Sequence, residues 1–126
     1  MRQNFSSGNK WEKAFAFSRA VRINNVIEVS GTVSVDETGE IIGINNPYEQ
    51  TKYIFEKILR YIEKAGGKKE DIIRTRMYVL NISDSEEIGR AHYEFFKGIE
   101  PATSMIEVKS FISEEFLVEI EATAVV

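Results

Sequence analysis

Few residue types in this 126-residue chain could do chemistry, because it has no cysteine and a single histidine, His92. The missing cysteines exclude disulfides, zinc thiolate sites and cysteine nucleophiles, and one histidine excludes a multi-histidine metal site. Carboxylates are then the main groups that can take up or release a proton. Glu119 and Glu121 alternate with apolar residues near the C-terminus. Both are therefore predicted to face one side of a strand whose other side belongs to the core.

Charge and hydropathy argue against two classes of partner, nucleic acids and membranes. The net charge is −4, and the densest basic spots, Lys68-Lys69 and Arg74/Arg76, have acidic residues close by. A nucleic-acid-binding protein usually carries a basic patch, so we expect no nucleic-acid partner. No basic and apolar leader opens the chain, and no apolar run approaches the roughly 20 residues that span a bilayer. We therefore expect no membrane association and a cytoplasmic location.

The elements that must position these residues belong to one domain, residues 1–126, as length and composition indicate. Gly and Asn at the turns and β-branched residues between them predict a series of strands. A hairpin is expected at 21–30, with its turn at Asn24-Asn25. A second strand pair is expected at 33–35 and 41–44, and further strands at 72–82, 103–108 and 116–125.

Two amphipathic helices are predicted between the strands. The first begins with Asn46 as its cap and Pro47 in the first turn, and it ends at Gly66-Gly67. The second is capped by Ser83 or Asp84 and stops at Gly98. Two such helices on one face of a mixed sheet give an α+β fold.

The opposite, helix-free face of the sheet can be predicted from the alternation of side chains along each strand. This reasoning assigns Ile73, Met77 and Val79 to the core. It places the following residues on the helix-free face: Arg74, Arg76, Tyr78, Met105, Glu107, Glu119 and Glu121. Such a mixture suits either a solvated face or a subunit interface with paired charges, where the apolar members would gain from burial.

The chain resembles the RidA family, also called YjgF, over nearly its whole length. The order and spacing of several short motifs carry the resemblance: Ser18-Arg19-Ala20-Val21, Val29-Ser30-Gly31-Thr32, Gln50-Thr51, Ala65-Gly66-Gly67, Arg76-Met77-Tyr78-Val79, Pro101-Ala102-Thr103 and Val118-Glu119-Ile120-Glu121-Ala122. The resemblance implies a chorismate-mutase-like α+β fold and a homotrimer with a small-molecule cleft between each pair of subunits. It also implies hydrolysis of reactive enamines or imines, such as 2-aminoacrylate, without a cofactor.

The family site resembled here has four parts, and this chain keeps two of them. The serine of the Ser-Gly motif is Ser30, followed by Gly31, and the glutamate of the last strand is Glu119. The family's carboxylate-binding arginine follows Pro-Ala, and here Thr103 follows Ala102. The family's tyrosine falls on Phe17. Without the arginine, a substrate carboxylate in the cleft would lose a charged contact, and such a loss costs about 2–5 kcal/mol when the partner is desolvated. The resemblance therefore implies an altered choice of substrate.

Two of these residues have competing interpretations. Glu119 either handles a proton in an inter-subunit cleft or forms an ion pair with Arg74 or Arg76. Arg76 either replaces the missing substrate anchor or is a plain salt-bridge residue.

Other side chains also have two interpretations. His92 lies on the apolar face of the second helix, where a histidine is usually packed, although its ordinary pKa would suit a base. Ser30 either contacts a ligand or serves the turn that follows it. The aromatic side chains of Trp11, Phe15 and Phe17 either line a ligand pocket or simply pack.

The sequence therefore leaves two functions open. One is a hydrolase or deaminase that acts on a small metabolite with an imine or enamine group, in which Glu119 positions water. The other is a non-catalytic, small-molecule-binding or regulatory trimer. The ribonuclease activity sometimes attached to the family fits the acidic charge balance poorly.

Overall fold

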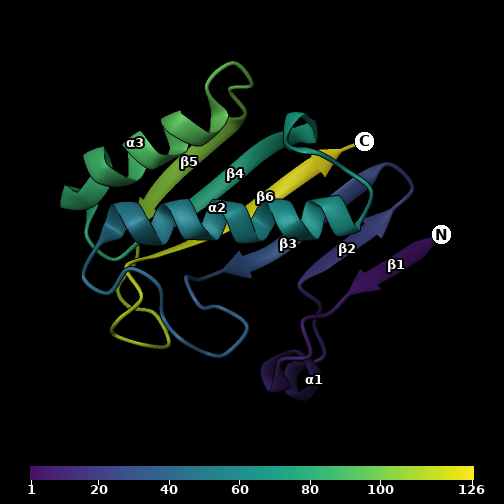
Figure 1. Cartoon of the computed structure of the whole chain (residues 1–126), viewed down its shortest axis with the longest axis horizontal. Helices are drawn as coiled ribbons and strands as arrows, with labels where there is room; N and C mark the ends of the chain where they lie inside the picture. The colour runs from purple at the N-terminus through teal and green to yellow at the C-terminus, as the bar shows by residue number, and fades with distance from the viewer.

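One mixed sheet of six strands organises the chain, in the order β1-β2-β3-β6-β4-β5 (Figure 1). The computed structural model describes all residues, Met1–Val126. All neighbouring strands are antiparallel except β4 and β5, which are parallel. The strands are β1 (Arg2–Phe5), β2 (Ala20–Ile23), β3 (Val26–Thr32), β4 (Ile72–Val79), β5 (Ala102–Glu107) and β6 (Val118–Val125).

The two long helices cover one face of this sheet (Figure 1). They are α2 (Pro47–Lys64) and α3 (Ser85–Phe96), and a short α1 (Lys10–Phe15) lies near the β1 end. Short 3-10 turns, η1 (Lys69–Asp71) and η2 (Ile82–Asp84), join the elements. Helix α2 begins as predicted, because the Asn46 side chain accepts a hydrogen bond from the Glu49 N–H at 3.0 Å. None of the helices is long and apolar enough to cross a membrane.

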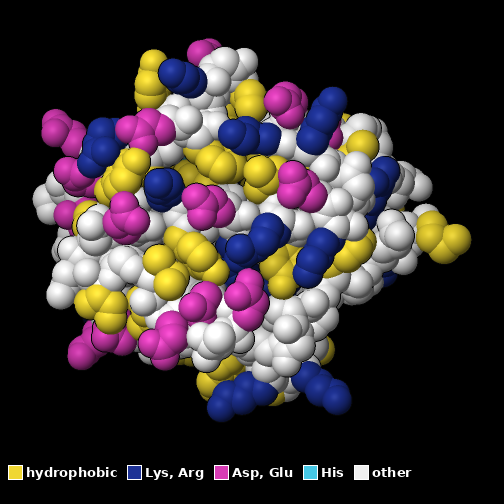
Figure 2. All heavy atoms as spheres, in the orientation of Figure 1, with side chains coloured by type: hydrophobic (Ala, Val, Ile, Leu, Met, Phe, Trp, Pro, Cys, Tyr) yellow, Lys and Arg dark blue, Asp and Glu magenta, His cyan; other side chains and the backbone are white.

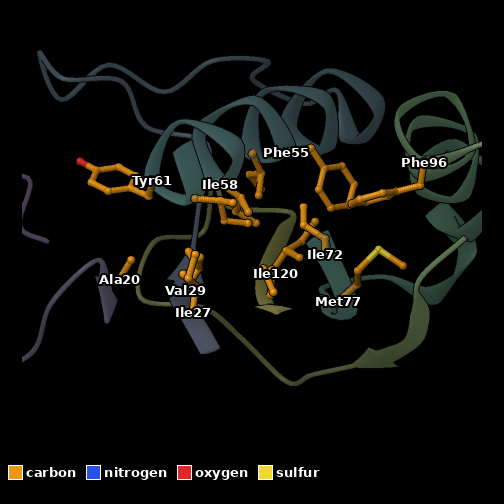
Figure 3. Packing of buried hydrophobic residues seen from close by; sticks show 14 of the residues in the cluster. Ala20, Ile27, Val29, Phe55, Ile58, Tyr61, Ile72, Met77, Phe96 and Ile120 are labelled. Carbon is orange, nitrogen blue, oxygen red and sulfur yellow. The ribbon is translucent and has the colours of Figure 1, made fainter. Parts of the chain in front are cut away.

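The core lies between α2, α3 and the sheet. In Figure 3 the side chain of Ile58 lies between α2 and the apolar residues of the strands, and the ring of Phe55 lies beside that of Phe96. On β6 the predicted core residues are fully buried: Val118, Ile120, Ala122 and Ala124. The outer surface of the helical side carries interspersed acidic and basic side chains (Figure 2). Both the predicted α+β class and the placement of two helices on one face are therefore confirmed.

The predicted strand pair at 33–35 and 41–44 is wrong. The two segments share only an isolated bridge between Val35 and Ile41. Pairing stops there because the Asp36 carboxylate accepts hydrogen bonds from the Thr38 and Glu40 N–H groups, and because Gly43 has a φ of 79°. Strand β1 and helix α1 were not predicted, and β4 ends at Val79 rather than at residue 82.

The side-chain alternation was wrong on β5. Met105 packs against the core, and the Glu107 carboxylate accepts a hydrogen bond from the Ile82 N–H at 2.9 Å. Neither side chain belongs to the helix-free face. Their places are taken by Ser104, which accepts a hydrogen bond from Arg74, and by Ile106. The register with β4 decides this orientation, because the alternation of an edge strand is defined only relative to its partner.

One prediction on β4 also fails. Ile73 is exposed, while its neighbour Ile72 is buried in the core. The pairing of β4 with β6 is irregular between Ile72 and Arg74, which shifts the alternation by one residue at this point.

Candidate functional site

The carboxylate of Glu119 lies directly against Gly31, where β6 and β3 run side by side. A Cβ added at Gly31 would collide with Glu119 Oε2, so this approach requires a glycine. The Glu119 side chain is half-buried, and no group of the chain donates a hydrogen bond to it. The structure therefore brings together two of the predicted site residues and leaves the carboxylate free to bind a ligand or water.

Glu119 opens into a hollow of about 570 Å³, which we call the Glu119 hollow. Burial raises the pKa of Glu119, the charge of Arg19 opposes this rise, and the nearby Glu121 adds to it. The partly buried position of this carboxyl therefore favours its protonated form more than an exposed position would. The hollow is lined by Val33, Ser110, Phe111, Ile112, Phe116 and Glu119.

A buried charge pair supports the backbone at Gly31. The Arg19 guanidinium donates a hydrogen bond to the Gly31 carbonyl at 2.8 Å, and its Nε lies 3.9 Å from Glu12 Oε2. Burial alone would raise the pKa of Glu12, but hydrogen bonds from Ser7 and Ser6 and the charge of Arg19 lower it overall. Neither Arg19 nor Glu12 was predicted as a functional residue, because only the fold brings them together.

Lys57 adds a second cation on this side of the molecule. Its ammonium donates a hydrogen bond to the Val35 carbonyl at 2.8 Å. Burial, reinforced by the positive charges of Arg19 and Arg60, lowers the pKa of Lys57 to about 8. A helical position gives no sequence signal for such a shift, so Lys57 also was not predicted.

Ser30 and Phe17 lie together in a second hollow of about 410 Å³, which we call the Ser30 hollow. The Ser30 hydroxyl donates to the Ser18 carbonyl at 2.6 Å, which leaves only its lone pairs for a ligand. The ring of Phe17 is 42% exposed. Trp11 and Phe15 stack on each other at 5.5 Å and do not line this hollow.

Within one chain, Ala102 and Thr103 are separated by β4 from Ser30, Gly31 and Glu119, although Arg76 lies on the neighbouring strand. They belong to β5, which forms one edge of the sheet, and β4 and β6 separate them from β3. A single chain therefore does not bring Thr103 together with Ser30 or Glu119.

Arg76 contacts Glu121 rather than Glu119. Its Nη1 lies 4.0 Å from Glu121 Oε1 and donates to Thr123 Oγ1 at 3.4 Å. Glu121 also accepts a hydrogen bond from Tyr78 at 3.3 Å. Within one chain, Glu119 pairs with neither Arg74 nor Arg76.

Comparisons with known proteins identify the class. Residues 8–126 match the family model described as Endoribonuclease L-PSP, and the chain belongs to this family, which includes the RidA/YjgF proteins. A Streptomyces coelicolor protein is 37% identical over 119 residues, which are 94% of this chain and 87% of that protein. A RutC family protein of Pyrococcus abyssi is 33% identical and covers 86% of this chain and 84% of its own length.

Solved structures agree with this assignment. A member of the YjgF/YER057c/UK114 family from Mycobacterium tuberculosis is 38% identical, with a TM-score of 0.91 and full coverage of both chains. The YjgF gene product of E. coli is 26% identical, with a TM-score of 0.82 and coverage of 97% and 93%. The predicted family and the chorismate-mutase-like fold are therefore confirmed.

Proposed function

We propose that the protein is a homotrimer whose inter-subunit clefts bind a small metabolite, and that it hydrolyses an enamine or imine group without a cofactor. The observation that carries this proposal is the Glu119 carboxylate, half-buried beside Gly31, with a raised pKa and no hydrogen-bond donor from the chain. Membership of the RidA/YjgF family supports a small metabolite as the ligand.

Glu119 would act as the proton carrier of the reaction. Its carboxylate takes a proton from a water molecule, whose oxygen attacks the carbon of the protonated C=N group. The protonated Glu119 returns this proton to the nitrogen of the resulting carbinolamine. As ammonia leaves, the Glu119 carboxylate takes the hydroxyl proton and the carbonyl forms. An enamine substrate would first take a proton from solvent on its carbon, which converts it to the protonated C=N form. Because Ser30 lines a different hollow from Glu119, its lone pairs and nearby backbone amides would hold polar atoms of a substrate that extends from the Glu119 hollow to the Ser30 hollow.

A trimer would bring the separated site residues together. Thr103 and Ala102 lie on the free edge of β5, so the β5 edge of a neighbouring subunit would complete the cleft around Glu119. The helix-free face also carries Ile106, 53% exposed, beside the charges of Arg76 and Glu121. Burial of such mixed surface is typical of subunit interfaces. Arg76 would then lie at this interface and remains a candidate for contact with the substrate.

One observation favours a non-catalytic binding trimer as the alternative. The family's arginine position is occupied by Thr103, and no Lys or Arg side chain is hydrogen-bonded to it. A protein without that anchor could bind a metabolite and fail to turn it over. Ribonuclease activity is not proposed, because the net charge of −4 does not favour a polyanionic substrate.

Ammonia release separates the two functions. Purified protein is incubated with enzymatically generated 2-aminoacrylate and with a panel of neutral and charged imines. We expect at least one substrate to be hydrolysed faster than in buffer, and we expect Glu119→Gln to lower that rate by about 100-fold or more. Glu121→Gln is the matched control, since Glu121 faces the same side but is held by Arg76 and Tyr78. No turnover of any substrate, with Glu119→Gln unchanged, would rule out the enzymatic proposal.

A further inference from the structure

A chain of three hydrogen-bonded side chains runs from the interior to the edge of the sheet. His92 Nε2 on α3 lies 2.9 Å from Thr75 Oγ1 on β4, which lies 2.6 Å from Thr103 Oγ1 on β5. Thr75 is fully buried, His92 is half-buried, and Thr103 is exposed. These hydrogen bonds therefore connect a half-buried imidazole, through a fully buried hydroxyl, to a hydroxyl on the molecular surface.

The fold holds each member of this chain in place. Thr75 and Thr103 are paired in the register of β4 and β5, so both point toward the helices. The imidazole of His92 packs against Phe96, with ring centres 4.7 Å apart, and against the edge of Phe55 at 5.4 Å. Rings packed in this way restrict the imidazole, so its Nε2 stays directed at Thr75.

The direction of the hydrogen bonds can reverse as a unit. When Nε2 carries a proton it donates to Thr75, Thr75 donates to Thr103, and the Thr103 hydroxyl is free to donate outward. When Nε2 is unprotonated, Thr75 donates to His92 and Thr103 donates to Thr75, so Thr103 offers lone pairs instead. Thr103 can thus present either a donor or an acceptor without any charge, and the chain polarises it in both states.

We propose that Thr103, positioned by Thr75 and His92, is the specificity-determining contact for a neutral hydrogen-bonding group of the ligand, such as an amide, ketone or uncharged imine. This inference rests on the proposed function, which places Thr103 in the ligand cleft. The surroundings disfavour a carboxylate there. No cationic side chain is hydrogen-bonded to Thr103, and the nearby Arg74 points to the other face, where it donates to Ser104 at 3.0 Å. One neutral hydroxyl does not offset the desolvation of an anion.

Because His92 is the only histidine of the protein, its imidazole reports directly on the hydrogen-bonded side chains of His92, Thr75 and Thr103. The imidazole resonances of His92 are followed by NMR while the intact protein is titrated with pyruvamide and, separately, with pyruvate, two probes that differ only in an amide and a carboxylate. We expect pyruvamide to shift the resonances and to bind at least about tenfold more tightly than pyruvate. Thr103→Val should abolish the shift, whereas Thr103→Ser, which keeps the hydroxyl, should preserve it.

Both Thr103 variants alter an exposed side chain, so we expect both to fold. In both variants Thr75 keeps its hydrogen bond to His92. The proposal is overturned if neither probe shifts the imidazole, if pyruvate binds as well as pyruvamide, or if Thr103→Val responds like the wild type. This readout does not depend on turnover. If pyruvamide shifts the His92 resonances but no imine of the panel releases ammonia, only hydrolysis is rejected. If an imine releases ammonia but pyruvamide causes no shift, only the role of Thr103 is rejected.

Discussion

At the scale of single residues, the candidate site is built on the contact between Gly31 and Glu119. Because Gly31 has no side chain, the Glu119 carboxylate can lie against its backbone in a half-buried position. No group of the chain donates a hydrogen bond to this carboxylate, so it is available to bind a ligand or water. The hydrogen bond from Arg19 to the Gly31 carbonyl, at 2.8 Å, holds the backbone of this place. The family resemblance pointed to Gly31 and Glu119, but it did not indicate how closely they meet.

The raised pKa of Glu119 gives a prediction about stability. A carboxyl group that binds its proton more tightly in the folded state stabilises the fold at low pH, and this stabilisation is lost as the pH rises above the ordinary value of 4.5 through the folded pKa. In Glu119→Gln this dependence is absent. We therefore expect the free energy of unfolding of the wild type to fall relative to that of the variant as the pH rises from about 4 to 7.

Chemical denaturation at a series of pH values and one fixed protein concentration measures this difference. If the difference between wild type and Glu119→Gln instead grew in favour of the wild type with rising pH, Glu119 would be part of a stabilising ion pair.

At the scale of elements, Gln50 connects helix α2 to the loops that form the Glu119 hollow. Its fully buried amide donates to the carbonyls of Gly43, at 3.1 Å, and Glu115, at 2.9 Å, and accepts from the Leu117 N–H at 2.9 Å. One side chain thus satisfies three backbone groups from two separate loops. The position of Phe116, which lines the hollow, depends on this connection.

Replacing Gln50 by Leu keeps the side-chain volume similar but leaves those three backbone groups without a partner. Because unpaired buried polar groups cost about 1–3 kcal/mol each, we expect a total loss of roughly 2–4 kcal/mol in unfolding free energy after local relaxation. Denaturant titration measures the loss. Glu56→Leu, at an exposed position of the same helix, is the control and should change stability by less than about 0.5 kcal/mol. A similarly small effect for Gln50→Leu would show that the loops are held by other contacts.

At the scale of the whole molecule, the proposed site needs residues from two subunits. Glu119 and Thr103 lie on β6 and on the β5 edge, with β4 between them. A closed trimer would supply Glu119 from one subunit and Thr103 from the next. Light scattering should then give three times the chain mass of 14.4 kDa, and a monomer at micromolar concentration would contradict the trimer.

Mixed trimers test whether the site is shared. Glu119→Gln and Thr103→Trp, which would fill the cleft, should each be inactive alone. Equal amounts of the two, unfolded and refolded together, should regain about a quarter of the wild-type activity, because a random ring pairs two intact halves at that frequency. Ammonia release measures the recovery, and each variant refolded alone is the control. A mixture no more active than its parents would place the whole site within one subunit.

The sequence by itself determined the features that depend on local pattern. Alternation along β6 identified its core residues, and Asn46-Pro47 marked the start of α2, because burial and helix capping act on neighbours in the chain. The order of the short motifs also identified the family. These predictions needed no knowledge of which strand lies beside which.

Only the tertiary structure decided the features that depend on register between distant segments. Pairing with β4 turned Met105 toward the core and Thr103 toward His92, and an irregularity beside Ile72 exposed Ile73. The alignment of β3 with β6 brought Glu119 against Gly31. A shift of one residue reverses the face of every side chain on a strand, and the packing of the whole domain, not the local sequence, selects the register.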